Sequence, residues 1–341
     1  MHLHRQVYPF NIQKAEKMLH VKNLKVDFEV DGRQIRVLHG VDLNLAEGET
    51  LGLVGESGCG KSVTCMTVLG LLGSNSTVSG EILYDGTDLL KLSPAKIEAI
   101  RGKDITMIFQ DPVVYMNPVK KIGSQITEVI HLHEKCTKEE ADKKAIELLR
   151  KVGIPHPESR MRYYPHQLSG GLCQRVMIAM ALACKPKLLM ADEPTTALDV
   201  TVQAQILDLL KDLNKSMGMA TILVTHDLGV IAENVKRVMV MYAGVVVEEG
   251  PVAKIFSNPS HPYTEGLLNS LPKMDNREAD LVPIEGTVPA PDKRPQGCCF
   301  GPRCKYKTEE CLKGQPKLTT LEGEHKCACF HPLNADLGGK A

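Results

Sequence analysis

Eight consecutive residues have the types and spacing needed to hold a polyphosphate. They fit the pattern G-x-x-x-x-G-K-[ST]. The run is Gly55-Glu56-Ser57-Gly58-Cys59-Gly60-Lys61-Ser62. Glycines let the backbone wrap closely around phosphate oxygens, so that N–H groups and a helix N-terminus point at the anion. We expect Lys61 to reach the β- and γ-phosphates of a nucleotide and the Ser62 hydroxyl to hold Mg²⁺.

An acidic pair forms a second candidate site. The apolar run 188–191 predicts a buried strand, and Asp192 and Glu193 follow it directly. Carboxylates at the tip of a buried strand are costly unless something compensates them. We expect Asp192 to bind Mg²⁺ through water and Glu193 to act as the base that polarises the attacking water.

Two more polar residues end predicted strands. Gln110 follows the apolar run 105–109, and His226 follows the strand predicted over 221–225. Open α/β sheets bind ligands outside the carboxyl ends of their strands. Gln110 should therefore contact Mg²⁺ or the attacking water, and His226 the γ-phosphate. Either residue alone is more often structural, and only the full set favours the catalytic interpretation.

The run 168–172 precedes a helix predicted over 176–183 and is a further candidate anion site. Ser169 is a good N-cap, and Gly170 and Gly171 allow close backbone approach. An ordinary capped helix is the alternative.

The elements that must position these residues indicate an α/β protein. The run 51–54 predicts the strand before the glycine-rich loop, and 61–72 the helix after it. Strands over 20–30 and 35–45, joined by a turn at 31–32, predict an antiparallel β layer. A hairpin is predicted at 80–88 and another at 237–249. Helical spacing over 122–132 and 138–152 predicts a helical insertion near 116–167.

Composition limits the functional classes. The 341 residues carry no net charge, which gives no support for a nucleic-acid surface. No apolar run is long enough to span a bilayer, and residues 1–17 have no secretory signal and read as an N-terminal extension. We expect a cytoplasmic protein that acts at a membrane only by binding partner proteins.

Together, these motifs resemble those of ATP-binding-cassette (ABC) ATPases over residues 18–256. In that family they are the Walker A loop (55–62), the Q-loop glutamine (Gln110), the signature motif (168–172), Walker B (188–193), the D-loop (197–199) and the switch histidine (His226). The signature departs from the family pattern at Leu172 and Cys173. The resemblance implies an ABC-type P-loop fold that binds ATP and Mg²⁺. The residues it places on the nucleotide are Phe28, Gly55, Ser57, Gly58, Cys59, Gly60, Lys61, Ser62, Val63, Ser169, Gly170, Gly171, Asp192 and Asp199.

The assignment of Phe28 as a nucleotide contact depends most on this resemblance. By position it could stack on an adenine ring or simply belong to the core. The family places an aromatic residue there for stacking, which favours the adenine contact.

Two further motifs lie after residue 256. They are His261-Pro262-Tyr263-Thr264, followed by Leu271-Pro272, and Gly297-Cys298-x-Phe300-x-x-Arg303-Cys304, followed by Cys311, Pro316 and Cys329. With these motifs, residues 257–341 resemble the C-terminal domain of the ATPase subunits of dipeptide, oligopeptide and nickel importers. The resemblance implies ATP hydrolysis that drives peptide uptake at the cytoplasmic face of the membrane. The implied partners are a second cassette (identical or paralogous), two transmembrane permease subunits and, indirectly, an extracytoplasmic solute-binding protein. A nickel importer or a nucleotide-gated metal-sensing protein is the alternative, and the single cassette argues against a soluble ABC protein of DNA repair or translation.

Six of the eleven cysteines crowd into residues 298–329. In a reducing compartment this density favours a metal over disulfides. The family pattern selects Cys298, Cys304, Cys311 and Cys329, with gaps of five, six and seventeen residues. Structural zinc sites usually have closer pairs, so a [4Fe–4S] cluster is expected. Zinc and free or oxidised thiols remain the alternatives.

Apolar residues after Gln110 are a candidate docking surface. Val113, Val114, Tyr115 and Met116 occupy a predicted loop. An exposed apolar patch suits a partner protein, and the resemblance implies the permease subunits. The alternative is that these side chains fold inward.

Overall fold

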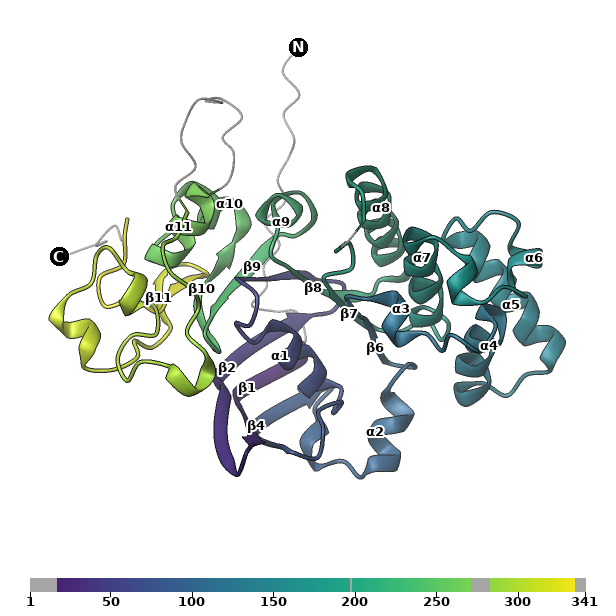
Figure 1. The fold of residues 1–341 in the computed structure, drawn as a ribbon, viewed down its shortest axis with the longest axis horizontal. Coiled ribbons are helices and arrows are strands. Elements are labelled where there is room, and N and C mark those ends of the chain that lie inside the picture. Colours follow the sequence, from purple (N-terminus) through teal and green to yellow (C-terminus); the bar gives the residue numbers. More distant parts are fainter. Residues whose placement is uncertain (1–16, 197, 271–282, 335–341) are drawn as a thin grey trace, which may run out of the picture.

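An eight-stranded sheet forms the centre of the computed structural model, which describes residues 17–196, 198–270 and 283–334 (Figure 1). Its strand order is β11-β12-β10-β9-β3-β8-β7-β6. The strands from β9 to β6 pair in parallel, which confirms the predicted α/β fold with a parallel core sheet. The bounds are β3 (Thr50–Val54), β6 (Ile105–Ile108), β7 (Leu188–Asp192), β8 (Ala220–Thr225), β9 (Arg237–Tyr242), β10 (Val245–Pro251), β11 (Thr319–Glu322) and β12 (His325–Cys327).

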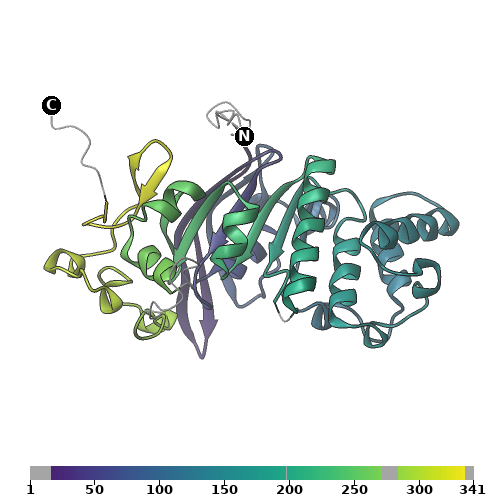
Figure 2. The ribbon, with the colours of Figure 1, turned by 90° about the horizontal axis from the view of Figure 1, so that it is seen from above.

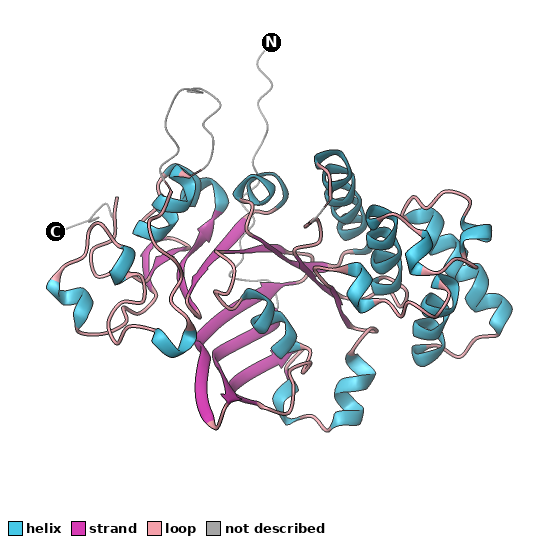
Figure 3. Ribbon diagram, viewed as in Figure 1, coloured by secondary structure: helices cyan, strands magenta, loops and turns pink. Residues whose placement is uncertain are grey.

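The predicted antiparallel layer is a second sheet of order β2-β1-β4-β5 (Figure 3). Its strands are β1 (Lys17–Val30), β2 (Arg33–Ala46), β4 (Ser76–Tyr84) and β5 (Thr87–Asp88). Asp31 and Gly32 both have positive φ, as the tight turn between β1 and β2 requires. Apolar side chains of this sheet, of helix α1 (Lys61–Val68) and of β3 and β7 form one core cluster.

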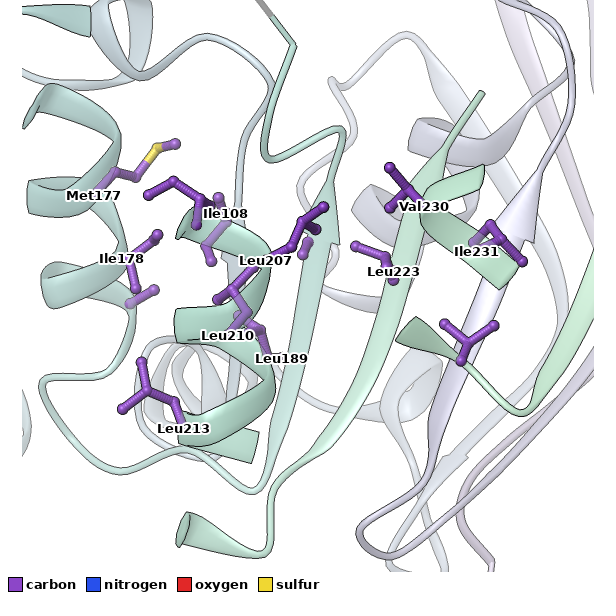
Figure 4. Packing of buried hydrophobic residues seen from close by; sticks show 14 of the residues in the cluster. Ile108, Met177, Ile178, Leu189, Leu207, Leu210, Leu213, Leu223, Val230 and Ile231 are labelled. Carbon is purple, nitrogen blue, oxygen red and sulfur yellow. The ribbon is translucent and has the colours of Figure 1, made fainter. Parts of the chain in front are cut away.

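A second core cluster lies on the other face of the main sheet (Figure 4). Leu189 of β7 and Leu223 of β8 are buried there beneath α8 (Val200–Met217) and α9 (Leu228–Asn234). The parallel strands are buried along their length because elements cover both faces. Three further helices are α2 (Pro94–Ile100), α10 (Val252–Ser257) and α11 (Pro262–Asn269).

A helical arm extends from one end of the molecule, opposite the C-terminal segment, by which we mean the described residues after 256, 257–270 and 283–334 (Figure 2). It contains α4 (Ile122–His133), α5 (Lys138–Lys151), α6 (Pro157–Arg160) and α7 (Gly170–Ala181). Thr137 and Glu140 form a reciprocal capping box at the start of α5. Helices α4 and α5 lie where the sequence predicted a helical insertion.

The Cys-rich segment continues the main sheet. Its hairpin β11–β12 joins the edge strand β10, with Glu248 opposite Cys327. This pairing covers an edge that would otherwise expose backbone N–H and C=O groups. The boundary at residue 256 and an independent C-terminal domain stay predictions.

Several predicted boundaries differ from the structure. The helix expected over 61–72 ends at Val68, and Gly70 then adopts a left-handed backbone with φ of 60°. The helix expected to begin at 176 begins at Gly170. The predicted loop at 113–116 is a one-turn helix, α3 (Pro112–Tyr115), because the Asp111 carboxylate accepts from two backbone N–H groups of that turn.

Some predictions lie outside the described residues. These are most of the N-terminal extension, Ala197 of the D-loop motif, residues 271–282, which include part of a connector predicted over 274–296 from its proline and charge content, and the last seven residues. Among the residues described, no helix combines the length and apolar character needed to cross a bilayer.

Candidate functional site

The loop between β3 and α1 has the backbone that its glycines predict. Gly55 has φ of 151°, and a Cβ there would lie 2.2 Å from the Met241 carbonyl oxygen. Gly60 has φ of 104°, and its Cβ would meet Leu38 at 2.6 Å. Side chains at these two positions would therefore force the loop open.

Lys61 is almost entirely buried within this loop. Its ammonium donates to the carbonyl oxygen of Gly55 at 2.7 Å and to that of Glu56 at 3.0 Å. The Cys59 side chain is buried in the core, and its Sγ lies 3.7 Å from the Lys61 ammonium. Cys59 can thus contribute to a phosphate site only through its backbone.

A cavity of about 620 Å³ opens above the loop and is large enough for a nucleotide. Sequence motifs separated by more than a hundred residues meet in its wall. The predicted site residues that line it are Gly55, Ser57, Gly58, Gly60, Lys61, Ser62, Val63, Gln110, Glu193 and His226. It is also lined by residues that the sequence analysis missed, namely Val37, Val54, Glu56, Thr196, Leu228 and Leu267.

The Glu193 carboxylate is the point where the predicted catalytic residues meet. Its Oε2 accepts from Gln110 Nε2 at 3.1 Å and from the Thr196 hydroxyl at 2.8 Å. Its Oε1 lies 3.2 Å from His226 Nδ1. Burial raises the pKa of Glu193, but the hydrogen bonds from Thr196 and His226 outweigh it, and the net pKa is lowered. The carboxylate is therefore ionised at neutral pH, as a base must be.

Asp192 precedes it at the end of β7 and is buried. Burial raises the pKa of this carboxyl, and a hydrogen bond with the Ser62 side chain partly offsets that effect. Within the described residues, its Oδ1 has no hydrogen-bond partner. A buried carboxylate oxygen that lacks a partner, beside a hydroxyl, is a donor set suited to Mg²⁺. Asp192 and Ser62 thus fit the predicted Mg²⁺ ion.

The predicted contacts of the signature and D-loop motifs do not line the cavity. Ser169 precedes α7, is exposed, and makes no capping hydrogen bond with its side chain. Gly171 packs against α8, where a Cβ would lie 2.9 Å from Val202. The Asp199 carboxylate caps α8 by accepting from the Val202 N–H. Within one chain, Ser169, Gly170, Gly171 and Asp199 therefore stay predicted nucleotide contacts.

The structure shows where Cys173 and Phe28 lie. Cys173, the departure from the signature pattern, is buried and donates to the Pro165 carbonyl oxygen at 3.3 Å, so the thiol fits its site. Phe28 is half-buried on β1, packs against the cluster shared by the two sheets and does not line the cavity. Its stacking on adenine stays a prediction.

Two residues of the C-terminal segment contact the phosphate loop, and neither contact was predicted from the sequence. The Glu56 N–H donates to the Tyr263 hydroxyl at 2.8 Å. The Arg303 guanidinium forms a two-pronged ion pair with the Glu56 carboxylate, at 2.7 and 3.1 Å. Each partner lies more than two hundred positions along the chain, where no local pattern can indicate the contact.

The four selected cysteines line one small pocket. Cys298, Cys304, Cys311 and Cys329 share its wall with Phe300, Phe330, His261 and His331. Burial raises the pKa of Cys298 and Cys304, and that of Cys329 to about 11. In the described part of the chain, no three His, Cys, Asp or Glu side chains are grouped closely enough to hold a metal ion. The predicted metal centre therefore stays a prediction.

Two family models match the chain. The model "ABC transporter" matches residues 38–196, and the model "Oligopeptide/dipeptide transporter, C-terminal region" matches residues 247–311. The first match contains the phosphate loop, Gln110 and Glu193. The second contains Tyr263, Arg303 and the first three selected cysteines.

Curated relatives are similar along nearly the whole chain. A dipeptide transport ATP-binding protein of Haemophilus influenzae is 49% identical over 93% of this chain and 96% of its own. An oligopeptide transport ATP-binding protein of Bacillus subtilis is 48% identical over 94% and 90%. A solved dimeric ATP-binding cassette, in a post-hydrolysis state with ADP and Pi, has a TM-score of 0.63 and 31% identity over 69% of this chain and 99% of its own.

Proposed function

The chain belongs to the ATP-binding proteins of peptide-importing ABC transporters, and from this premise we propose that it hydrolyses ATP to drive peptide uptake. The observation that carries the proposal is the meeting of Gln110, Thr196 and His226 on the Glu193 carboxylate, beside the phosphate loop. A nickel importer is not favoured, because these relatives are named for dipeptides and oligopeptides.

Each group at the site has a distinct task in this proposal. The phosphate loop and Lys61 bind the β- and γ-phosphates, and Ser62 and Asp192 would hold Mg²⁺, which neutralises phosphate charge when bound. Glu193 polarises the attacking water. Gln110 and His226 orient that water and the γ-phosphate, since both already contact the carboxylate.

We assign the partners by the same family membership. Two cassettes would face each other, so that Ser169 and Gly171 of one complete the phosphate site of the other. The exposed Ser169, with its hydroxyl free of any capping bond, supports this arrangement. Transmembrane permease subunits would hold the pair at the cytoplasmic face of the membrane and receive peptide from a solute-binding protein.

Reconstitution tests the function. The chain, its permease subunits and the solute-binding protein are placed in vesicles, and uptake of a labelled dipeptide and an oligopeptide is measured with and without ATP. ATP-dependent uptake is expected. Steady-state phosphate release distinguishes the alternative of a metal-sensing protein, which would bind ATP with little turnover. Nickel uptake without peptide uptake would contradict the proposal.

We also propose that the cysteine pocket holds a [4Fe–4S] cluster. A single zinc ion needs four sulfurs about 2.3 Å from the metal, whereas a cluster has its own volume and holds its thiolates further apart. Four cysteines line one pocket, and four thiolates are the usual complement of such a cluster. Cys299 and Cys327 are fully buried and lie outside the pocket lining.

Anaerobic purification tests the cluster. A brown protein with a broad visible absorption band and near-stoichiometric iron and sulfide is expected. Cys304→Ser should lose the colour, and Cys299→Ser, which removes a thiol outside the lining, should keep it. A colourless protein with one zinc per chain would reject the cluster and retain the four-cysteine site.

A further inference from the structure

The phosphate cavity contains a carboxylate that its ligand should repel. Glu56 occupies the second position of the phosphate loop and lines the cavity. ATP brings several negative charges to the same space, and two like charges a few ångströms apart in a partly dry site destabilise each other. A free Glu56 carboxylate would therefore weaken nucleotide binding.

Arg303 neutralises this carboxylate from the C-terminal segment. Its side chain is 5% exposed, and both terminal nitrogens donate to Glu56. Its Nε donates to the Glu285 carbonyl oxygen at 2.8 Å and its Nη2 to the Ile284 carbonyl oxygen at 3.2 Å. The guanidinium is thus fixed on several sides and directs its planar fork at one carboxylate, which a lysine could not match.

Tyr263 fixes the backbone of the same residue. It is fully buried, and its hydroxyl accepts the Glu56 N–H. Its ring packs edge-on against Tyr242, with ring centroids 4.7 Å apart, and also contacts Phe300 at 5.4 Å. Tyr242 in turn lies below the Arg303 guanidinium and receives a hydrogen bond from it at 3.4 Å.

Glu56 connects the contacts made by Arg303 and Tyr263 to Lys61. The Glu56 carboxylate is held by Arg303, its N–H by Tyr263, and its carbonyl oxygen accepts from the Lys61 ammonium. A displacement of Glu56 would therefore move an acceptor of the phosphate-binding lysine.

We propose that Arg303 and Tyr263 are positioning residues for the phosphate loop, which neutralise and fix Glu56 so that the cavity accepts ATP. This inference rests on the proposed ATPase function. It gives the C-terminal segment a part in nucleotide binding that is independent of any metal in the cysteine pocket.

A double-mutant cycle with Glu56 tests the inference in the full-length protein. Arg303→Met should raise the KM for ATP about tenfold, because the Glu56 charge is left unpaired, while kcat changes much less. In the Glu56→Gln background the same change should raise the KM less than about twofold, since no carboxylate remains to repel ATP. Arg303→Lys should recover part of the affinity, and Tyr263→Phe should cause a smaller rise.

The matched control removes another ion pair of the C-terminal segment. Lys254 pairs with Glu322 at 2.9 Å, outside the cavity, so Lys254→Met should leave the KM unchanged. Calorimetric titration with Mg-ATP and a thermal melt, run on every variant, separate lost affinity from lost folding. Folded Arg303→Met that binds ATP like the parent, or an equal loss in both backgrounds, would overturn the inference. Absence of ATP binding by the parent would instead reject the proposed function.

Discussion

The carboxylate of Glu193, which we propose as the general base, lies 3.2 Å from His226 Nδ1, although 33 positions separate the two residues in the chain. Strands β7 and β8 run parallel and adjacent, and each of these residues directly follows the last residue of its strand. The carboxyl ends of parallel strands meet at one edge, so the sheet itself brings base and imidazole together. Burial raises the pKa of Glu193, and the hydrogen bonds from Thr196 and His226 together lower it by more.

Removal of the Glu193 carboxylate should slow ATP hydrolysis without weakening ATP binding. We expect Glu193→Gln to bind Mg-ATP normally and to lose roughly 10²–10⁴-fold in hydrolysis rate, the usual contribution of a positioned general base. Phosphate release and equilibrium ATP binding measure the two effects. Glu158, an exposed carboxylate on α6, provides the control Glu158→Gln. Hydrolysis by Glu193→Gln at the parental rate would show that another group is the base.

Asp192→Asn should behave differently from Glu193→Gln. The change replaces one carboxylate oxygen of the buried side chain beside Ser62, where we place Mg²⁺. We expect weaker ATP binding in the presence of Mg²⁺ and little change when the ion is chelated. Equal losses with and without Mg²⁺ would point to a purely structural carboxylate.

Nucleotide should control dimerisation if the signature motif completes a partner's site. In the Glu193→Gln background, Mg-ATP should convert monomer to dimer in light scattering, and ADP should not, because ADP lacks the γ-phosphate. Adding Ser169→Glu should abolish the dimer by placing a carboxylate against phosphate. A dimer that persists in this variant would contradict the assignment, and a Glu193→Gln protein that stays monomeric with both Mg-ATP and ADP would argue against it.

Much of this site could be predicted because its residues lie in contiguous motifs. The glycine-rich loop needs only its own spacing, and Gln110, Glu193 and His226 each lie just after a run that predicts a strand. Parallel pairing then makes their meeting a consequence of topology. Thr196 could have been found as a hydroxyl three residues after the base, within reach of its carboxylate.

The contacts of the C-terminal segment could not be predicted in this way. Tyr263 and Arg303 reach Glu56 across 207 and 247 positions, and neither belongs to a periodic pattern that specifies a partner. The pairing of β12 with β10 is similarly non-local. Such contacts depend on how the segment folds back over the sheet edge, which the short strands themselves do not encode.

Acid should weaken the attachment of β2 to the C-terminal segment. Burial, helped by Arg294 and Arg36 and opposed by Asp27, lowers the pKa of His39 to about 4, and its Nδ1 accepts from Arg294 at 3.3 Å. The unfolded chain, with an ordinary histidine pKa near 6.5, therefore binds this proton first. The stabilisation is complete above pH 6.5 and is lost as the pH falls towards 4.

His39→Gln keeps an acceptor for Arg294 and removes the titration. We expect its free energy of unfolding to fall less steeply than that of the parent between pH 6.5 and 4.5, measured by denaturant unfolding. His131→Gln, a change at an exposed position on α4, is the control. Parallel pH profiles for parent and His39→Gln would show that His39 does not cause the acid sensitivity.

Charged substitutions at Val114 and Met116, both in the apolar stretch after Gln110, should have opposite effects on transport and stability. Val113, Val114 and Tyr115 on α3 are 54%, 73% and 53% exposed, which fits the predicted docking patch. Met116 is only 2% exposed, so its predicted place in that patch is wrong. Residues 113–115 lie on the exposed side of α3, whereas Met116, which follows the helix in an extended conformation, is buried in the core cluster shared with the helical arm.

Val114→Glu should therefore abolish peptide transport in reconstituted vesicles while ATP hydrolysis and the free energy of unfolding of the isolated chain stay unchanged, because the charge faces a partner only in the complex. Met116→Glu should instead destabilise the isolated chain by more than about 3 kcal/mol, since it buries an unpaired charge. Transport, phosphate release and denaturant unfolding of both variants separate the two outcomes. Full transport by Val114→Glu would mean that the permease subunits dock elsewhere, and equal destabilisation by the two changes would mean that α3 is part of the core.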